Sequence, residues 1–161
     1  LYGPRHSFLK ENPMIIAKFL HILGFTVWVG GMFFAHNALR PVVAVTLEPP
    51  QRLTLLAGVF TKFFLWVWIS IALVLASGLA MMAGMGKPPL HVMLMFVLGV
   101  IMMLIFAHIF FAPYRRLKRA VAAQDWKAGG AAMATIRKLV AINLIIGLLT
   151  IAIGALGPLA L

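Results

Sequence analysis

Four histidines lie inside or at the edges of two long apolar segments, and their imidazole groups could hold a metal ion or a haem iron. His21 and His36 belong to the first segment, KFLHILGFTVWVGGMFFAHN. His91 and His108 belong to the second, PPLHVMLMFVLGVIMMLIFAHIFF. Ionisable side chains are costly in hydrocarbon, and those that occur there usually face the interior of a helix bundle and mark a site. We therefore interpret these histidines as candidate ligands of a membrane cofactor.

The spacing of the histidines predicts an outer pair and an inner pair. His21 and His36 are about 22 Å apart along a helix, and His91 and His108 are about 25 Å apart, at about 1.5 Å per residue. Antiparallel packing of the two segments would place His21 level with His91 and His36 level with His108. His21 and His36 are about 60° apart around the helix, whereas His91 and His108 are about 100° apart. The spacing therefore favours the outer pair, His21 and His91.

A haem iron held between two histidines has no open position, so it would carry electrons rather than bind substrate. We expect one haem b at the outer pair, with a second haem or metal at the inner pair as an open alternative. Haem propionates need cationic partners, and the arginines near the inner pair would supply them. The candidate haem-binding residues are His21, His91, His36, His108, Arg40 and Arg115.

Methionines offer a copper site as the alternative to haem. Met85 lies near the outer end of the second apolar span, and Met93 follows His91 by two residues. Thioethers bind Cu(I), and imidazole also suits copper. Methionine is common filler in apolar helices as well. The candidate metal ligands are His21, His91, Met93 and Met85.

The composition is that of an integral membrane protein. The 161 residues are 63% hydrophobic and only 11% charged, against about 25% charged in soluble domains, and the mean hydropathy is +1.05. A spanning helix needs about 20 apolar residues, and four segments qualify. We expect an all-α, integral membrane four-helix up-down bundle over residues 14–161, preceded by a polar, irregular N-terminal extension or vector remnant at 1–13. The expected spans are about 14–37, 53–84, 90–119 and 132–156.

The basic residues predict the orientation of the bundle. Lys and Arg concentrate in the connections between the first and second spans and between the third and fourth. Short basic loops face the cytoplasm, which would place both termini outside it. Because the positive charge gathers between apolar spans, without a basic face interleaved with aromatics, we expect the partner to be a lipid bilayer and not nucleic acid. With no cysteine, thiolate metal sites are excluded.

The first span, LHILGFTVWVGGMFFAHNALRP, resembles the opening helix of the copper-resistance D (CopD) family of bacterial inner-membrane proteins. The shared pattern is Leu20-His21, Trp28, Gly30-Gly31 and Arg40-Pro41. The segments FAPYRRLKRAV and IRKLVAINLIIGLLTIAIGALGP look like the last two helices of that family, so the resemblance covers nearly all of residues 14–158. It implies a multi-pass protein of the bacterial inner membrane that handles copper.

The HemJ-type protoporphyrinogen oxidases are related, share the four-helix plan and bind haem b. An early histidine of that group matches His21. The group also has a histidine followed two residues later by a lysine; the histidine matches His91, but Met93 stands here in place of the lysine. The resemblance favours a haem-binding redox protein linked to copper handling. The alternative functions are copper transport and the role of an accessory subunit in a larger membrane complex. A HemJ-like oxidase comes last, because Met93 replaces the lysine. The chain could also form a homo-oligomer.

Overall fold

The computed structural model describes residues 5–160, with side chains for residues 13–159. Four helical segments, 13–46, 49–83, 90–122 and 126–159, are long and apolar enough to cross a membrane. The expected all-α architecture with four membrane spans is therefore confirmed. In chain order the elements are α1 (Arg5–Phe34), η1 (Ala35–Leu39), α2 (Arg40–Thr46), α3 (Pro49–Ala83), α4 (Leu90–Phe111), α5 (Pro113–Ala122) and α6 (Trp126–Ala160).

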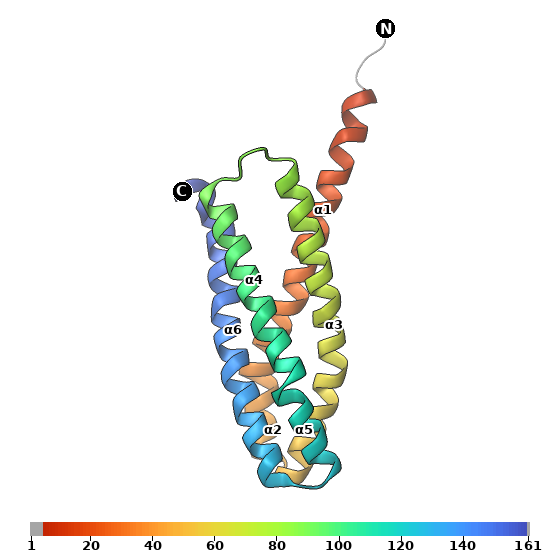
Figure 1. Ribbon diagram of the computed structural model, residues 1–161, viewed down its shortest axis with the longest axis vertical. Coiled ribbons are helices and arrows are strands. Elements are labelled where there is room, and N and C mark those ends of the chain that lie inside the picture. The colour runs from red at the N-terminus through yellow and green to blue at the C-terminus, as the bar shows by residue number, and fades with distance from the viewer. Residues whose placement is uncertain (1–4, 161) are drawn as a thin grey trace.

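The helices run up and down along one long bundle (Figure 1). We call the end where α1 begins and α6 ends the terminal end, and the opposite end, where α2 leads to α3 and α5 leads to α6, the basic end. α1 packs mainly on α3, whereas α4 and α5 pack mainly on α6. The ribbons of α3 and α4 diverge toward the terminal end (Figure 1). The bundle therefore consists of two helix pairs that are less closely joined at the terminal end.

α1 and α4 run parallel, so the antiparallel packing expected for the histidine segments is wrong. In an up-down bundle the chain reverses its direction at each connection between spans. The first and third spans therefore point the same way. This parallel arrangement is the one that brings His21 and His91 toward the terminal end and His36 and His108 toward the basic end. Antiparallel helices would have paired His21 with His108.

The first span does not stop before Arg40, as expected, but continues to Thr46 through the π-helical turn η1. In this turn the backbone N–H of Arg40 donates to the carbonyl of Ala35, five residues earlier. Pro41 cannot donate a backbone hydrogen bond, and in a regular α-helix its ring clashes with the carbonyl four residues before it. The wider π-turn relieves that clash. At its other end, α1 already begins at Arg5, so most of the expected irregular extension is helical.

Two glycines of α1 let it approach α3 closely. A Cβ atom on Gly24 would lie 2.8 Å from Cγ2 of Val74 and 3.1 Å from the backbone oxygen of Ser70. A Cβ on Gly31 would overlap the ring of Phe63. Small residues at such positions let membrane helices pack backbone to backbone. The seven-residue spacing of these glycines is therefore explained by helix packing.

The buried apolar core fills the middle and the basic end of the bundle but not the terminal end. The core residues nearest the terminal end are Trp28 in α1, Ile71 in α3, Met102 in α4 and Leu144 in α6. Beyond them, no apolar side chain among residues 13–159 is buried toward the terminal end. The part of the bundle that carries His21 and His91 is therefore held together without a close-packed apolar interior.

Candidate functional site

The His21 side chain is half-buried on α1 and oriented by α3. Its Nδ1 lies 3.1 Å from Oγ of Ser77, and that hydroxyl donates its own proton to the carbonyl of Leu73. Since the hydroxyl proton is used, Oγ of Ser77 accepts from Nδ1–H of His21, which leaves a lone pair on Nε2. This is the arrangement of metal-binding histidines, in which a hydrogen bond to one ring nitrogen orients the other.

The backbone of α3 at Gly78 also contacts the His21 ring. A Cβ on Gly78 would lie 3.2 Å from Cε1 of His21. The ring also meets Phe25 edge to face, with centroids 6.4 Å apart. These contacts, together with Ser77, fix the plane of the imidazole before any ligand binds.

His91 begins α4 and rests on α6. A Cβ on Gly157 would overlap the Cβ of His91, so the two helices touch here almost backbone to backbone. Nδ1 of His91 is buried and has no hydrogen-bond partner among the described residues. A buried polar atom without a partner costs about 1–3 kcal/mol. Nδ1 of His91 is therefore available to bind a ligand or cofactor, since no described residue forms a hydrogen bond with it.

His21 and His91 lie at similar depths. A Cβ on Gly147 would be 3.0 Å from both Cγ2 of Val29 in α1 and Cε of Met102 in α4. Val29, Met102 and Gly147 therefore lie at one depth along the bundle, which serves as a reference for the two helices. From that level, at about 1.5 Å per residue, His21 lies about 12 Å and His91 about 16 Å toward the terminal end. The two imidazoles thus differ by about 4 Å in depth but rest on different helices, α3 and α6.

The inner pair is not brought together in the same way. His36, in η1, is half-buried and faces α6, whereas His108, in α4, is exposed. η1 packs on α1, α2 and α6, and α4 packs on α3, α5 and α6. The backbone does break at Ala112, with φ −113° and ψ −85°, but this bend follows His108 and does not redirect it. A shared inner site would require His108 to turn inward.

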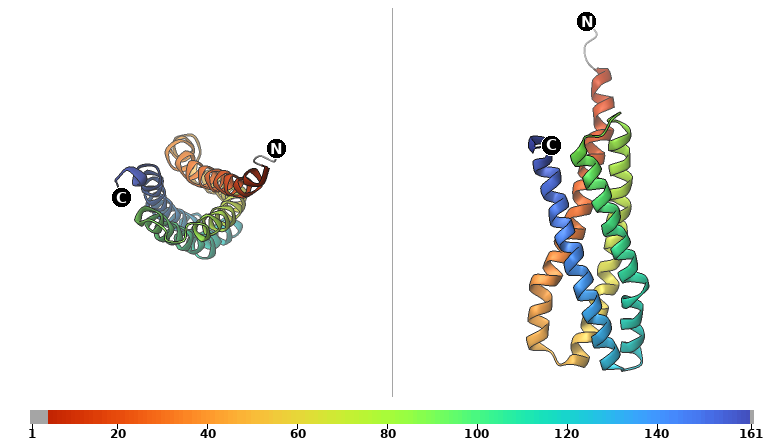
Figure 2. Two further views of the ribbon diagram at one scale, coloured as in Figure 1. Left: turned by 90° about the horizontal axis from the view of Figure 1, so that it is seen from above. Right: turned by 60° about the vertical axis from the view of Figure 1, so that its left-hand side comes forward.

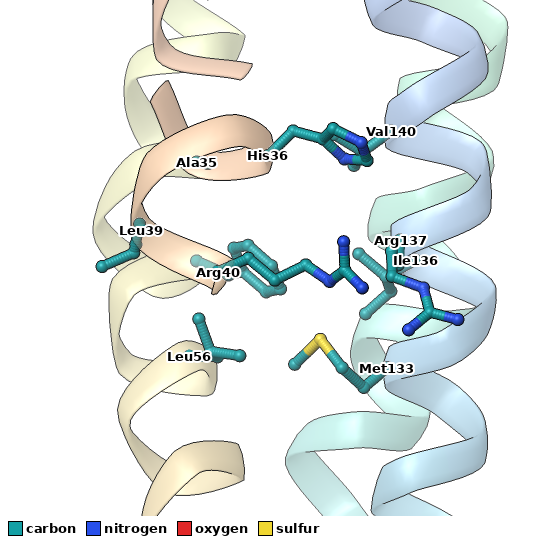
Figure 3. Close-up of a pocket in the computed structure, with 10 residues that line it drawn as sticks. Ala35, His36, Leu39, Arg40, Leu56, Met133, Ile136, Arg137 and Val140 are labelled. Atoms are coloured by element: carbon teal, nitrogen blue, oxygen red, sulfur yellow. The ribbon is translucent and has the colours of Figure 1, made fainter. Parts of the chain in front are cut away.

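The two expected propionate partners occupy different surroundings. Arg40 lines a groove between η1 and α6, and its guanidinium points toward that of Arg137 (Figure 3). Arg115 lies on α5, with Cζ 5.0 Å from the ring centroid of Phe111. Arg137 is a residue of the groove that the sequence does not single out. Only the packing of α6 against η1 brings it there.

The methionines divide into packing residues and exposed residues. Met102 is buried, and Met95 lies against Gly154, where a Cβ would come within 2.8 Å of its Cε. Met85 and Met93 are 46% and 41% exposed, so their sulfur atoms are accessible near the terminal end. No cluster of three or more histidine or carboxylate side chains is found among the described residues. A site here would use two imidazoles, with or without thioethers.

Comparison with known families agrees with the resemblance. The family model of Copper resistance protein D matches residues 57–156, from the first turns of α3 to near the end of α6, including His91 and His108. Comparisons with curated proteins and with solved structures gave no match. The match covers more than half of the chain. The chain therefore belongs to the copper resistance protein D (CopD) family.

Proposed function

We propose that this CopD-family membrane protein binds one haem b through His21 and His91 and carries electrons in copper handling. The observation that supports this most is the pair of half-buried imidazoles. They lie at similar depth on α1 and α4, in the part of the bundle where the buried apolar core has ended. His21, about 12 Å from the level of Gly147, lies within the apolar layer, where ionisable groups usually serve function.

Two features of the described residues support haem binding. Nε2 of His21 has a free lone pair because Ser77 engages Nδ1, and His91 has a buried nitrogen without a partner among the described residues. The helix backbones approach both rings closely at Gly78 and Gly157, which holds the rings in place. When bound, a haem with two histidine ligands exchanges single electrons. The protein's own contribution is to orient the two imidazoles.

The orientation of the bundle follows from its basic end. The connections there and the adjoining turns carry Arg52, Arg116, Lys118, Arg119 and Lys127, whereas the α3–α4 connection at the terminal end carries only Lys87. By the positive-inside rule the basic end faces the cytoplasm. We infer that the outer histidines lie in the extracytoplasmic half of a bacterial inner membrane. Electron partners would then approach from that side.

The direct test is the absorption spectrum of the detergent-purified protein after expression with added haem precursor, with metal analysis of the same sample. We expect a Soret band, sharp visible bands on reduction, and about one haem per chain. A sample that remains without a Soret band after haem is supplied to the purified protein would refute the proposal.

Copper transport is the second candidate, because the exposed thioethers of Met85 and Met93 lie near the terminal end and Met93 is two residues from His91. The same metal analysis separates the two candidates. Bound copper that depends on Met85 and Met93, in a sample without haem, would favour transport.

Removing the hydroxyl that orients His21 should weaken cofactor binding without unfolding the bundle. In Ser77→Ala, Nδ1 of His21 loses its acceptor, so the ring can rotate and exchange tautomers. We expect haem affinity to fall by about ten- to a hundred-fold, the usual effect of losing such a partner, in a haem titration of the apoprotein. Ser70→Ala is the matched control, because Ser70 is a buried serine of the same helix without a bond to His21. Equal losses in both variants would mean that Ser77 only packs.

A further inference from the structure

A groove with an apolar floor and a cationic rim lies near the basic end, between η1 and α6. Phe60 of α3 and Ile136 and Val140 of α6 form part of its floor. His36, Arg40 and Arg137 form its rim, and the guanidinium group of Arg40 extends toward α6, which carries Arg137 (Figure 3). Lys138 lines an open extension of the groove together with His36, Arg40 and Arg137. The groove therefore joins a hydrophobic wall to several positive charges.

Within residues 13–159, no acidic side chain lines the groove. Arg40 and Arg137 both line it, so two positive charges share this space. Within residues 13–159 the carboxylates are Glu48 and Asp125, which lie in the connections at the basic end. Asp125 caps the first turn of α6 through the N–H of Ala128. Two arginines that line one groove, without an acid among its described lining residues, favour an anion as their partner.

The depth of the rim is that of a headgroup layer. From the level of Gly147, Arg137 lies about 15 Å and Arg40 about 16 Å toward the basic end, at about 1.5 Å per residue. The basic helix α5 begins at Pro113, which lies about 16 Å from the same level when counted from Met102. Basic residues concentrate where membrane helices leave the acyl chains on the cytoplasmic side. The arginines are therefore placed where phosphate groups of the leaflet are found.

We propose that this groove binds an anionic phospholipid, with its phosphate between Arg40 and Arg137 and an acyl chain along the apolar floor. The planar guanidinium group suits phosphate because it can donate two parallel hydrogen bonds. Basic pockets between membrane helices at the cytoplasmic side recognise anionic headgroups in this way. Viewed along the bundle, α2 and α6 lie at the two ends of an open arc (Figure 2), so a lipid can enter sideways from the leaflet.

The test compares lipid retention by native mass spectrometry and lipid selectivity in nanodiscs. The nanodiscs contain phosphatidylcholine alone or mixed with phosphatidylglycerol. The test variant is Arg40→Gln/Arg137→Gln. The control is Arg116→Gln/Arg119→Gln, which removes the same charge from exposed positions of α5 outside the groove. We expect wild type and control to retain one phosphatidylglycerol per chain, and the test variant to lose the preference for it by about ten-fold or more.

The outcomes distinguish the groove from general surface charge and from the haem. Arg40→Lys/Arg137→Lys keeps the charge but not the paired donors, so it should recover the preference only in part and shows that the fold persists. An equal loss in the test variant and the control would overturn the proposal. So would displacement of the lipid by inorganic phosphate at the same concentration, which would identify free phosphate as the ligand. Unchanged lipid preference in the test variant would also overturn the proposal, whereas its haem content should match that of the wild type because His21 and His91 lie about 27 Å or more from these arginines along the bundle.

Discussion

Replacing either His21 or His91 with alanine should remove the spectrum of a haem with two histidine ligands. His21→Ala deletes the imidazole whose Nε2 is kept free by Ser77. His91→Ala deletes the one whose Nδ1 has no partner within residues 13–159. With one ligand left, the iron is either released or becomes five-coordinate and open to small ligands. The measurement is haem content per chain, with the reduced spectrum before and after addition of carbon monoxide. We expect carbon monoxide to bind only to variants that retain haem.

His36→Ala and His108→Ala are the matched controls, since they remove the same group from the inner pair. His108 is exposed and His36 faces the groove at η1, so both variants should keep the wild-type spectrum. If His36→Ala or His108→Ala lost the haem while His21→Ala and His91→Ala kept it, the site would be at the basic end and the proposed ligands would be wrong.

Gly157→Ala should both destabilise the bundle and displace His91. The added Cβ would overlap the Cβ of His91, an atom fixed to the main chain that cannot swing aside, so α4 and α6 must separate near the terminal end. Overpacking of this kind typically costs about 1–3 kcal/mol. We expect a lower thermal midpoint in detergent for the haem-free protein, together with reduced haem content after haem is supplied.

Gly130→Ala makes the same chemical change in the same helix where nothing lies within 4 Å of the added Cβ. It should leave the thermal midpoint and the haem content unchanged, or raise the midpoint slightly because alanine favours helix. A wild-type midpoint for Gly157→Ala would show that α6 moves away from His91 at little cost. In that case the contact does not position the imidazole.

The number and type of elements were predictable from the sequence because four apolar stretches of sufficient length leave few alternatives in a membrane. The end of the first span was not predictable in the same way. Arg40-Pro41 is a typical helix stop, but the π-turn before Pro41 carries the helix on to Thr46. A local irregularity of this kind depends on how the whole segment packs, and residue types alone do not report it.

The candidate site was predictable in depth but not in direction. Residue counting placed His21 level with His91, but on the wrong premise that the two segments are antiparallel; in the parallel arrangement the packing around Gly147 puts them within about 4 Å in depth. It did not show that His21 is held by Ser77 of α3 or that His91 rests on Gly157 of α6. Nor did it show that His108 is exposed. Which face of a helix a residue occupies follows from the neighbouring helices, and these are set by contacts far apart in the sequence.

The π-turn at Ala35–Leu39 makes the groove tolerant of a change of one residue in chain length at this point. A π-turn holds one residue more than an α-turn, so it takes up that residue without rotating the helix that follows. Deleting one residue between positions 35 and 39 would therefore restore regular α-helical winding and leave Arg40 beside α6 and Val43 buried. Deleting a residue in the regular part of α1 instead, where no turn can take up the change, would rotate the following side chains by about 100° and move Arg40 away from α6.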